Sequence, residues 1–101
     1  MITPLPEPLF ELGKLIATPA ALQSIHDSGQ EVSEFLNEHI RGNWGVLSDV
    51  DRMNNEEAVA TGDRIYSVYR TANGTKIWII TEPEDEAGNR YLTTVVLPSE
   101  H

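Results

Sequence analysis

The pattern of hydrophobic residues changes near Arg64 from a helical period to a strand period. After this point the chain reads RIYSVYRT, ANGT and KIWIITE. Asn73-Gly74 is a strong signal for a tight hairpin with a two-residue turn. The acidic stretch PEDEAGN then leads to RYLTTVVLP, where Pro98 ends the last strand. This half of the chain is therefore predicted to form a three-stranded antiparallel meander.

A short strand and a first helix are predicted near the start of the chain. LGKLIATP is an apolar stretch typical of a strand. Thr18 is a suitable N-cap, and Pro19 occupies the first helical position, where its missing N–H costs nothing. The helix is predicted to end at about Ser28, with Leu22 and Ile25 on one face.

The clearest amphipathic pattern lies in residues 30–41. Its apolar positions follow the spacing i, i+3, i+4, i+7, i+8; they are Val32, Phe35, Leu36, His39 and Ile40. The charged residues Glu31, Glu34, Glu38 and Arg41 face away. The start of this helix stays open, because Ser33 suits both an internal position and the N-cap of a shorter helix.

A third helix is predicted from Ser48 to about Thr61. Ser48 and Asp51 match the capping box, and the acidic first turn suits the helix dipole. Its apolar stripe is thin and consists of Val50, Met53 and Ala60, which predicts a lightly packed surface helix.

The fold class that follows is α+β: a short N-terminal strand and about three helices, followed by a three-stranded antiparallel β-meander. The first strand is a candidate fourth member of the sheet. Residues 1–11 are rich in proline and are predicted to form an extended arm. Residues 12–101 have the length of one domain.

Charge and composition limit the function. Seven Lys and Arg face sixteen Asp and Glu, for a net charge of -9, so direct nucleic-acid binding is not expected. The chain has no cysteine, which excludes disulfides and thiolate metal sites and makes the cytoplasm the default location. The start lacks the features of a signal peptide, and no apolar run is long enough for a membrane span.

Trp44 lies in the stretch GNWGVLSDVDRMNN, between two glycines and ahead of a helix start. Gly42 ends one helix and Gly45 can supply an unusual backbone angle, which is typical of a corner between helices. The ring either plugs this corner into the core or is an exposed interaction anchor. We favour the core plug, because tryptophan is mostly buried.

No pattern of catalytic or cofactor-binding residues was found. His39 lies in an apolar stripe, where a hydrogen-bonded structural histidine is more common than a catalytic base, and His26 suits a helix C-terminus. DVDRMNNEE lacks the glycine and the spacing of a calcium loop. The serines are not in a nucleophile elbow, and no glycine loop could hold phosphates. We therefore predict a protein that is not an enzyme and uses no cofactor or metal.

The acidic residues form three groups. Two contain the candidate interaction residues: Glu31, Glu34 and Glu38 lie along one predicted helix, and Glu84, Asp85 and Glu86 lie with Glu82 in one predicted loop. The third group lies along another predicted helix and consists of Asp49, Asp51, Glu56 and Glu57. If such groups were contiguous, they could imitate a track of phosphates. Ordinary solvated faces are the more common explanation of charge runs like these.

Several segments together resemble a family of small bacterial plasmid-associated or mobile-element-associated proteins of unassigned function. These segments are LGKLIATPAAL, GNWGVLSDVDRMNN, ATGDRIYSVY, NGTKIWIITE and TTVVLP, and they cover most of residues 12–98. Some members carry the label of a restriction-modification subunit, whose cofactor-binding glycine loop and Asn-Pro-Pro-aromatic motif this chain lacks. The resemblance implies an accessory role and supplies no catalytic residues.

The leading hypothesis is a small acidic, non-enzymatic interaction protein that binds a protein partner or itself. A second is a nucleic-acid mimic that blocks a DNA-processing or RNA-guided defence enzyme. A third is a small toxin-like ribonuclease, since helices followed by a meander also describe that fold, although such toxins resemble basic proteins.

Overall fold

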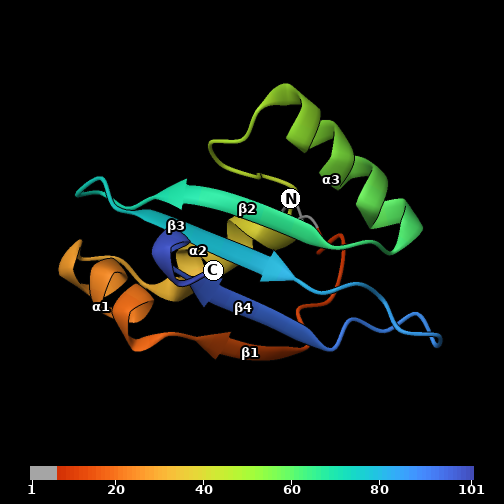
Figure 1. Cartoon of the computed structure of the whole chain (residues 1–101), viewed down its shortest axis with the longest axis horizontal. Coiled ribbons are helices and arrows are strands. Elements are labelled where there is room, and N and C mark those ends of the chain that lie inside the picture. Colours follow the sequence, from red (N-terminus) through yellow and green to blue (C-terminus); the bar gives the residue numbers. More distant parts are fainter. Residues whose placement is uncertain (1–6) are drawn as a thin grey trace, which may run out of the picture.

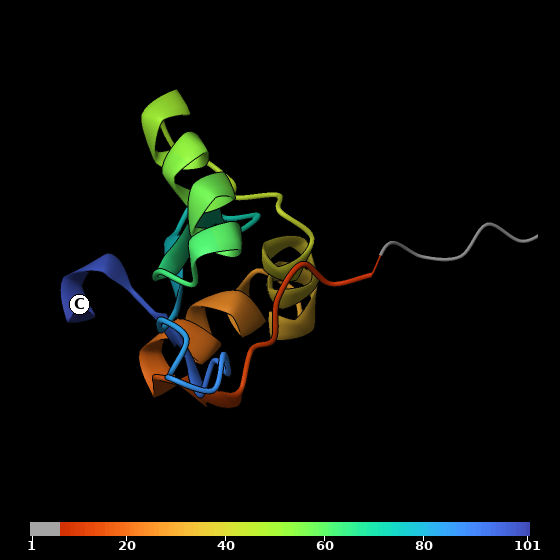
Figure 2. The same cartoon turned by 90° about the vertical axis from the view of Figure 1, so that its right-hand side faces the viewer.

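The computed structural model describes residues 7–101 and shows three helices packed around a four-stranded mixed sheet (Figure 1). The sheet order is β1-β4-β3-β2. In chain order the elements are β1 (Lys14–Ala17), α1 (Pro19–Asp27), α2 (Val32–Ile40), α3 (Asp49–Thr61), β2 (Ile65–Arg70), β3 (Lys76–Thr81), β4 (Leu92–Val96) and the 3-10 turn η1 (Pro98–Glu100). Helices α1 and α2 lie on one side of the sheet, and η1 lies on the other side (Figure 2).

The sheet corrects the predicted three-stranded meander. Strands β2, β3 and β4 pair antiparallel in sequence, but β1 adds a fourth strand parallel to β4, with Leu15 opposite Thr93. The α+β class is confirmed. The direction of β1 was not predictable, because its partner lies more than seventy residues away in sequence and packing alone specifies the pairing.

The helix ends agree closely with the prediction, whereas two buried faces do not. Thr18 and Ser48 are side-chain N-caps, and Gly62 ends α3 in the left-handed conformation. In α1 the buried residues are Ala21 and Ile25, while Leu22 is exposed.

The predicted apolar stripe of α3 is wrong. Val50 and Met53 are 67% and 70% exposed, and the helix turns Asn55 and Ala58 toward the protein instead. The reason is Asn55: its amide donates to the Tyr66 carbonyl at 2.6 Å and accepts from the Tyr66 N–H at 3.3 Å. A polar side chain thus takes the place of a neighbouring strand at the edge of β2.

The β2–β3 hairpin also differs in detail. The Thr71 N–H donates to the Thr75 carbonyl at 2.8 Å, which leaves three residues in the loop, with Gly74 at φ 92°. This is the hairpin class with a type I turn followed by a left-handed glycine, one residue longer than predicted.

The core fills the space between the sheet and the two helices that cover it. Phe35 and Leu36 of α2 pack there with Ile77 and Ile79 of β3 and with Val95 of β4. All five predicted apolar positions of α2 are buried or half-buried, so its predicted face is confirmed.

A smaller apolar cluster lies between α3 and β2, where Trp44 packs with Ala58 and Ile65. Phe10 stacks on Trp44 with ring centroids 6.2 Å apart, and the Leu9 N–H donates to the Ile40 carbonyl. Leu9 and Phe10, assigned above to the arm, therefore pack against the domain. Residues 1–6 of that arm lie outside the described part of the chain.

Candidate functional site

The face of the sheet opposite α1 and α2 carries only the short 3-10 turn η1 and is called here the open sheet face. Side chains alternate along a strand. Those at Ser67 and Ile79 point toward α2 and the core, so the intervening positions form the open face. Its central members are Tyr66, Val68, Lys76, Trp78, Ile80, Thr94 and Val96.

Part of this face is hollowed into a groove of about 520 Å³. Its floor is formed by β2 and β3, one wall by residues 46–48 with Asp51 of α3, and the other side by His101. The lining residues are Val46, Leu47, Ser48, Asp51, Arg64, Tyr66, Val68, Lys76, Trp78, Ile80 and His101. The floor is mostly apolar and contains two aromatic rings, which is the usual composition of a binding surface.

The wall at residues 46–48 is held by a close approach to β2. Gly45 forms a bridge with Val68, and the Val46 N–H donates to the Val68 carbonyl at 2.7 Å. Gly45 has φ 78°, and a Cβ there would lie 2.0 Å from the Val68 carbonyl oxygen. Glycine is required at this position, and the packed backbone fixes Val46 at the rim with 52% of its surface exposed.

Cationic side chains stand at both ends of the groove. Arg64 precedes β2, and Lys76 begins β3; because these strands are antiparallel, the two residues lie at opposite ends. Arg70 is the cross-strand neighbour of Lys76. Arg70 lies six positions after Arg64 along the chain, so the two cationic ends are roughly 20 Å apart.

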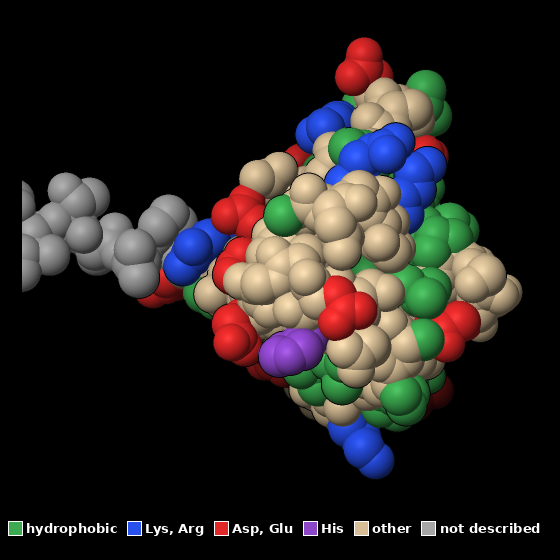
Figure 3. Space-filling model, turned by 90° about the vertical axis from the view of Figure 1, so that its left-hand side faces the viewer, with side chains coloured by type: hydrophobic (Ala, Val, Ile, Leu, Met, Phe, Trp, Pro, Cys, Tyr) green, Lys and Arg blue, Asp and Glu red, His purple; other side chains and the backbone are tan. Residues whose placement is uncertain are grey.

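The acidic majority of the chain is scarcely represented in the groove. Among the described residues that line it, Asp51 is the one acidic side chain. In Figure 3, several Lys and Arg side chains lie together next to hydrophobic surface at the upper right, whereas several acidic side chains lie along the opposite, left edge of that view. The groove therefore has a local charge unlike that of the whole chain.

Polar groups of the groove make specific contacts with its two aromatic rings. Partial burial raises the pKa of Tyr66, and the Asp51 carboxylate beside its hydroxyl raises it further. The ring of His101 packs against Trp78 with centroids 5.0 Å apart. Both aromatic rings are partly exposed and available for contact.

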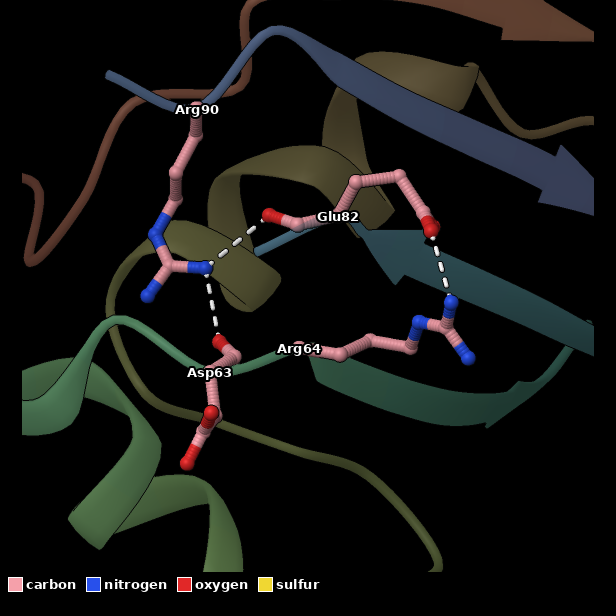
Figure 4. A network of polar contacts seen from close by, with 4 residues as sticks. All are labelled: Asp63, Arg64, Glu82 and Arg90. Carbon is pink, nitrogen blue, oxygen red and sulfur yellow. Dashed lines mark hydrogen bonds and ion pairs between the residues drawn. The ribbon is translucent and has the colours of Figure 1, made fainter. Parts of the chain in front are cut away.

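A polar network secures the Arg64 end of the groove (Figure 4). Arg64 donates to the Glu82 carboxylate at 2.9 Å. The buried Arg90 guanidinium donates to the carbonyls of Asp63, Glu82 and Ala58 at 2.8, 3.1 and 3.1 Å. Arg90 thereby ties the end of α3 to the ends of β2 and β3, and desolvation lowers the pKa of its guanidinium.

Trp44 lies outside the groove. Its ring is 1% exposed, and its Nε1 donates to the Glu56 carboxylate at 2.9 Å. The prediction of a core plug at the corner is confirmed, and the ring has no exposed surface to offer a partner.

The acidic residues named as interaction candidates lie in two separate elements. Glu31, Glu34 and Glu38 are exposed on α2. The Glu34 carboxylate accepts a hydrogen bond from the Glu31 N–H at 3.3 Å at the start of this helix, and the Glu38 carboxylate accepts one from Asn43. The carboxylates of Glu34 and Glu38 therefore have local structural contacts.

The second acidic group lies in the exposed loop between β3 and β4. The Asp85 carboxylate accepts from the N–H groups of Ala87 and Asn89, both at 2.9 Å. Glu84 forms a backbone bridge with Arg90. Neither Glu84, Asp85 nor Glu86 lines the groove.

His39 is buried within a chain of hydroxyl groups. The Thr93 hydroxyl donates to the Leu12 carbonyl at 2.7 Å, so its oxygen accepts from Thr81 at 2.8 Å. Since the single Thr81 hydrogen is thereby used, Thr81 accepts from His39 Nε2 at 2.9 Å. The His39 Nδ1 atom then accepts from Ser67 at 2.5 Å.

The hydrogen-bond chain assigns His39 as a neutral ring with its proton on Nε2. Burial lowers its pKa to about 3, and the charge of Arg90 acts in the same direction. The structural role predicted for this histidine is confirmed by its burial and its partners.

The groove residues were missed by the sequence reasoning. The alternation of KIWIIT already groups Lys76, Trp78 and Ile80 on one face. However, the pattern does not say which face the helices cover or whether they cover both faces.

Comparison of the chain with protein families, curated proteins and solved structures found no match. Within residues 7–101, no group of three or more His, Asp or Glu side chains is arranged to hold a metal ion. No helix in the described part of the chain has the length and hydropathy needed to cross a membrane.

Proposed function

We propose that this protein is a non-enzymatic interaction domain and that the groove on its open sheet face binds a protein partner. The observation that carries the proposal is the combination of partly exposed Tyr66 and Trp78 with an apolar floor in a groove of about 520 Å³. Aromatic residues surrounded by a polar rim are the usual anchors of protein interfaces.

The polar groups of the groove favour binding over catalysis. The Ser48 hydroxyl is engaged as the N-cap of α3, and Asp51 faces the Tyr66 hydroxyl. A nucleophile needs a base within hydrogen-bonding distance and a third group that orients the base. The described groove residues contain no such triad. The hydrogen-bond chain through His39 is buried outside the groove, and it ends where the Thr93 hydroxyl donates to the Leu12 backbone carbonyl.

The contacts of the acidic side chains give little support to nucleic-acid mimicry. The hydrogen bond from the Glu31 N–H to Glu34, the Glu38–Asn43 contact and the Asp85 loop contacts account for several carboxylates locally. An accessory role in a mobile element, which the resemblance of the sequence implies, is compatible with a binding domain that has no chemistry of its own.

A matched pair of substitutions tests the proposal. Val46→Glu places a charge at the rim of the groove, and Leu22→Glu places the same charge on the outer face of α1, where Leu22 is 42% exposed. Tagged wild-type protein and both variants are used for affinity capture from a lysate of the native host. We expect a protein that the wild type and Leu22→Glu retain and that Val46→Glu loses at least about tenfold, because a buried unpaired charge opposes docking.

Two outcomes of this capture would contradict the proposal. One is an equal recovery of proteins with both variants. The other is the recovery of nucleic acid alone by the wild type. Circular dichroism of each variant shows whether the fold is retained, so that a loss of capture is assigned to the surface.

A further inference from the structure

The structure assigns a specific chemistry to the partner: we propose that the groove binds an amphipathic helix whose apolar stripe is flanked at both ends by Asp or Glu residues. This inference rests on the proposed function. It adds the secondary structure, length and charge pattern of the segment that binds.

The hydrogen bonding of the sheet favours a helix over an extended strand. A peptide lying across the face of a sheet receives no backbone hydrogen bonds from the strands, so it must satisfy its own N–H and C=O groups. The alternative, a strand added at the β2 edge, is blocked because Asn55 occupies the backbone groups of Tyr66. Residues 44–46 likewise occupy those of Val68.

The dimensions of the groove set the length of the helix. The two cationic ends are roughly 20 Å apart along β2. A helix rises 1.5 Å per residue, so about 13 residues span this distance. Between the ends, the partly exposed Tyr66 and Trp78, with Val46 at the rim, provide the apolar surface that would receive side chains spaced i, i+3, i+4 and i+7.

The charge of the groove specifies acidic flanks. Arg64 stands at one end, and Lys76 stands at the other. Arg64 is tied to Glu82 by one guanidinium nitrogen, Nη2. Asp51 is set against the Tyr66 hydroxyl at the α3 wall. A partner with carboxylates at both ends matches this pattern, and a basic partner meets like charge.

The apolar floor also distinguishes this partner from a single-stranded nucleic acid. Trp78 and Tyr66 could stack with bases, but Val46 and Leu47 add aliphatic surface beside these rings, and the floor residues Val68 and Ile80 are buried. Few cations are present to neutralise phosphates, and the chain as a whole carries a net charge of -9. Helical peptide binding accounts for both the aliphatic and the charged groups.

Three synthetic helices and one oligonucleotide are suitable probes. Each peptide is about 14 residues long, carries four Leu at i, i+3, i+4 and i+7, and is held helical by the same side-chain crosslink. The ends carry Glu in the first peptide, Gln in the second and Lys in the third. A twelve-nucleotide oligouridine is the fourth probe. Binding is followed by ¹H–¹⁵N NMR of the full chain, through the Trp78 indole and the amides of β2 and β3.

Lys76→Glu and Arg41→Glu form a matched pair of variants. Each changes the net charge equally, but Arg41 lies at the C-terminal end of α2, outside the groove. We expect the Glu-flanked peptide to shift groove resonances and to bind most tightly. Lys76→Glu should weaken its binding by about five- to tenfold, and Arg41→Glu by less than about twofold. The same Lys76→Glu change should strengthen binding of the Lys-flanked peptide.

The other outcomes separate this inference from the proposed function. Equal binding of all three peptides in the groove, unaffected by Lys76→Glu, would contradict the inference that the partner has acidic flanks. The proposal that the groove binds a protein would still stand. Groove shifts with oligouridine alone would overturn both proposals. The absence of groove shifts with every probe would overturn the helix inference, while the Val46→Glu capture experiment decides the proposed function independently.

Discussion

Replacing Trp44 with Ala should lower the free energy of unfolding by about 3 to 5 kcal/mol. The ring is 1% exposed and packs with Ala58, Ile65 and Phe10. Its removal leaves a cavity between α3 and β2 and deprives the Glu56 carboxylate of a hydrogen-bond donor. Urea denaturation followed by circular dichroism measures this loss.

Trp78→Ala is the matched control for the role of Trp44. Trp78 is partly exposed on the open sheet face, and we expect its replacement to cost about 1 kcal/mol. The same substitution should weaken the binding of a groove partner, because the ring belongs to the groove floor. A Trp44→Ala variant as stable as Trp78→Ala would show that the corner between α2 and α3 does not depend on its plug.

The stability of the protein should fall in mild acid because of His39. Its folded-state pKa of about 3 is below the ordinary value of 6.5. Between these values the unfolded chain binds the additional proton. The contribution of His39 is therefore complete above pH 6.5 and is lost progressively as the pH falls toward 3. It amounts to roughly 2 kcal/mol between pH 7 and pH 5.

The His39→Gln variant isolates this contribution, because glutamine does not titrate. The stability difference between wild type and His39→Gln should shrink as the pH falls from 7 to 5. The His26→Gln variant is the control, since His26 is exposed on α1. NMR of the wild-type ring should show a neutral Nε2–H form throughout this range. A His39 that titrates near pH 6.5 in the folded protein would contradict the buried hydrogen-bond chain.

Local signals in the sequence predicted the helices and the antiparallel strands well. The helix ends are set by the side-chain N-caps Thr18 and Ser48 and by the left-handed backbone of Gly62. Each of these effects depends on only a few neighbouring residues. The pairing of β1 and the burial of Asn55 depend on contacts between distant segments. Periodicity carries no information about such contacts, which explains the errors in the sheet and in the face of α3.

The groove was hidden by its mixture of residue types. A run such as KIWIIT is compatible with a strand buried on both faces, and only the packing of α1 and α2 on one side reveals that Trp78 is left partly exposed. The net charge of -9 was equally uninformative, because it averages over a groove whose two ends are cationic. The acidic pattern predicted interaction surfaces on α2 and on the loop before β4. The groove lies on the opposite side of the sheet from α2.

Photo-crosslinking from the groove tests the central claim most directly. Benzoylphenylalanine is incorporated at position 78, where it replaces one aromatic ring with another, and separately at position 22 on α1. After irradiation in the native host, crosslinked species are separated and identified by mass spectrometry. We expect a defined protein adduct from position 78 that is absent from position 22. Equal adducts from both positions, or crosslinks to nucleic acid alone, would contradict the assignment of the open sheet face as a protein-binding surface.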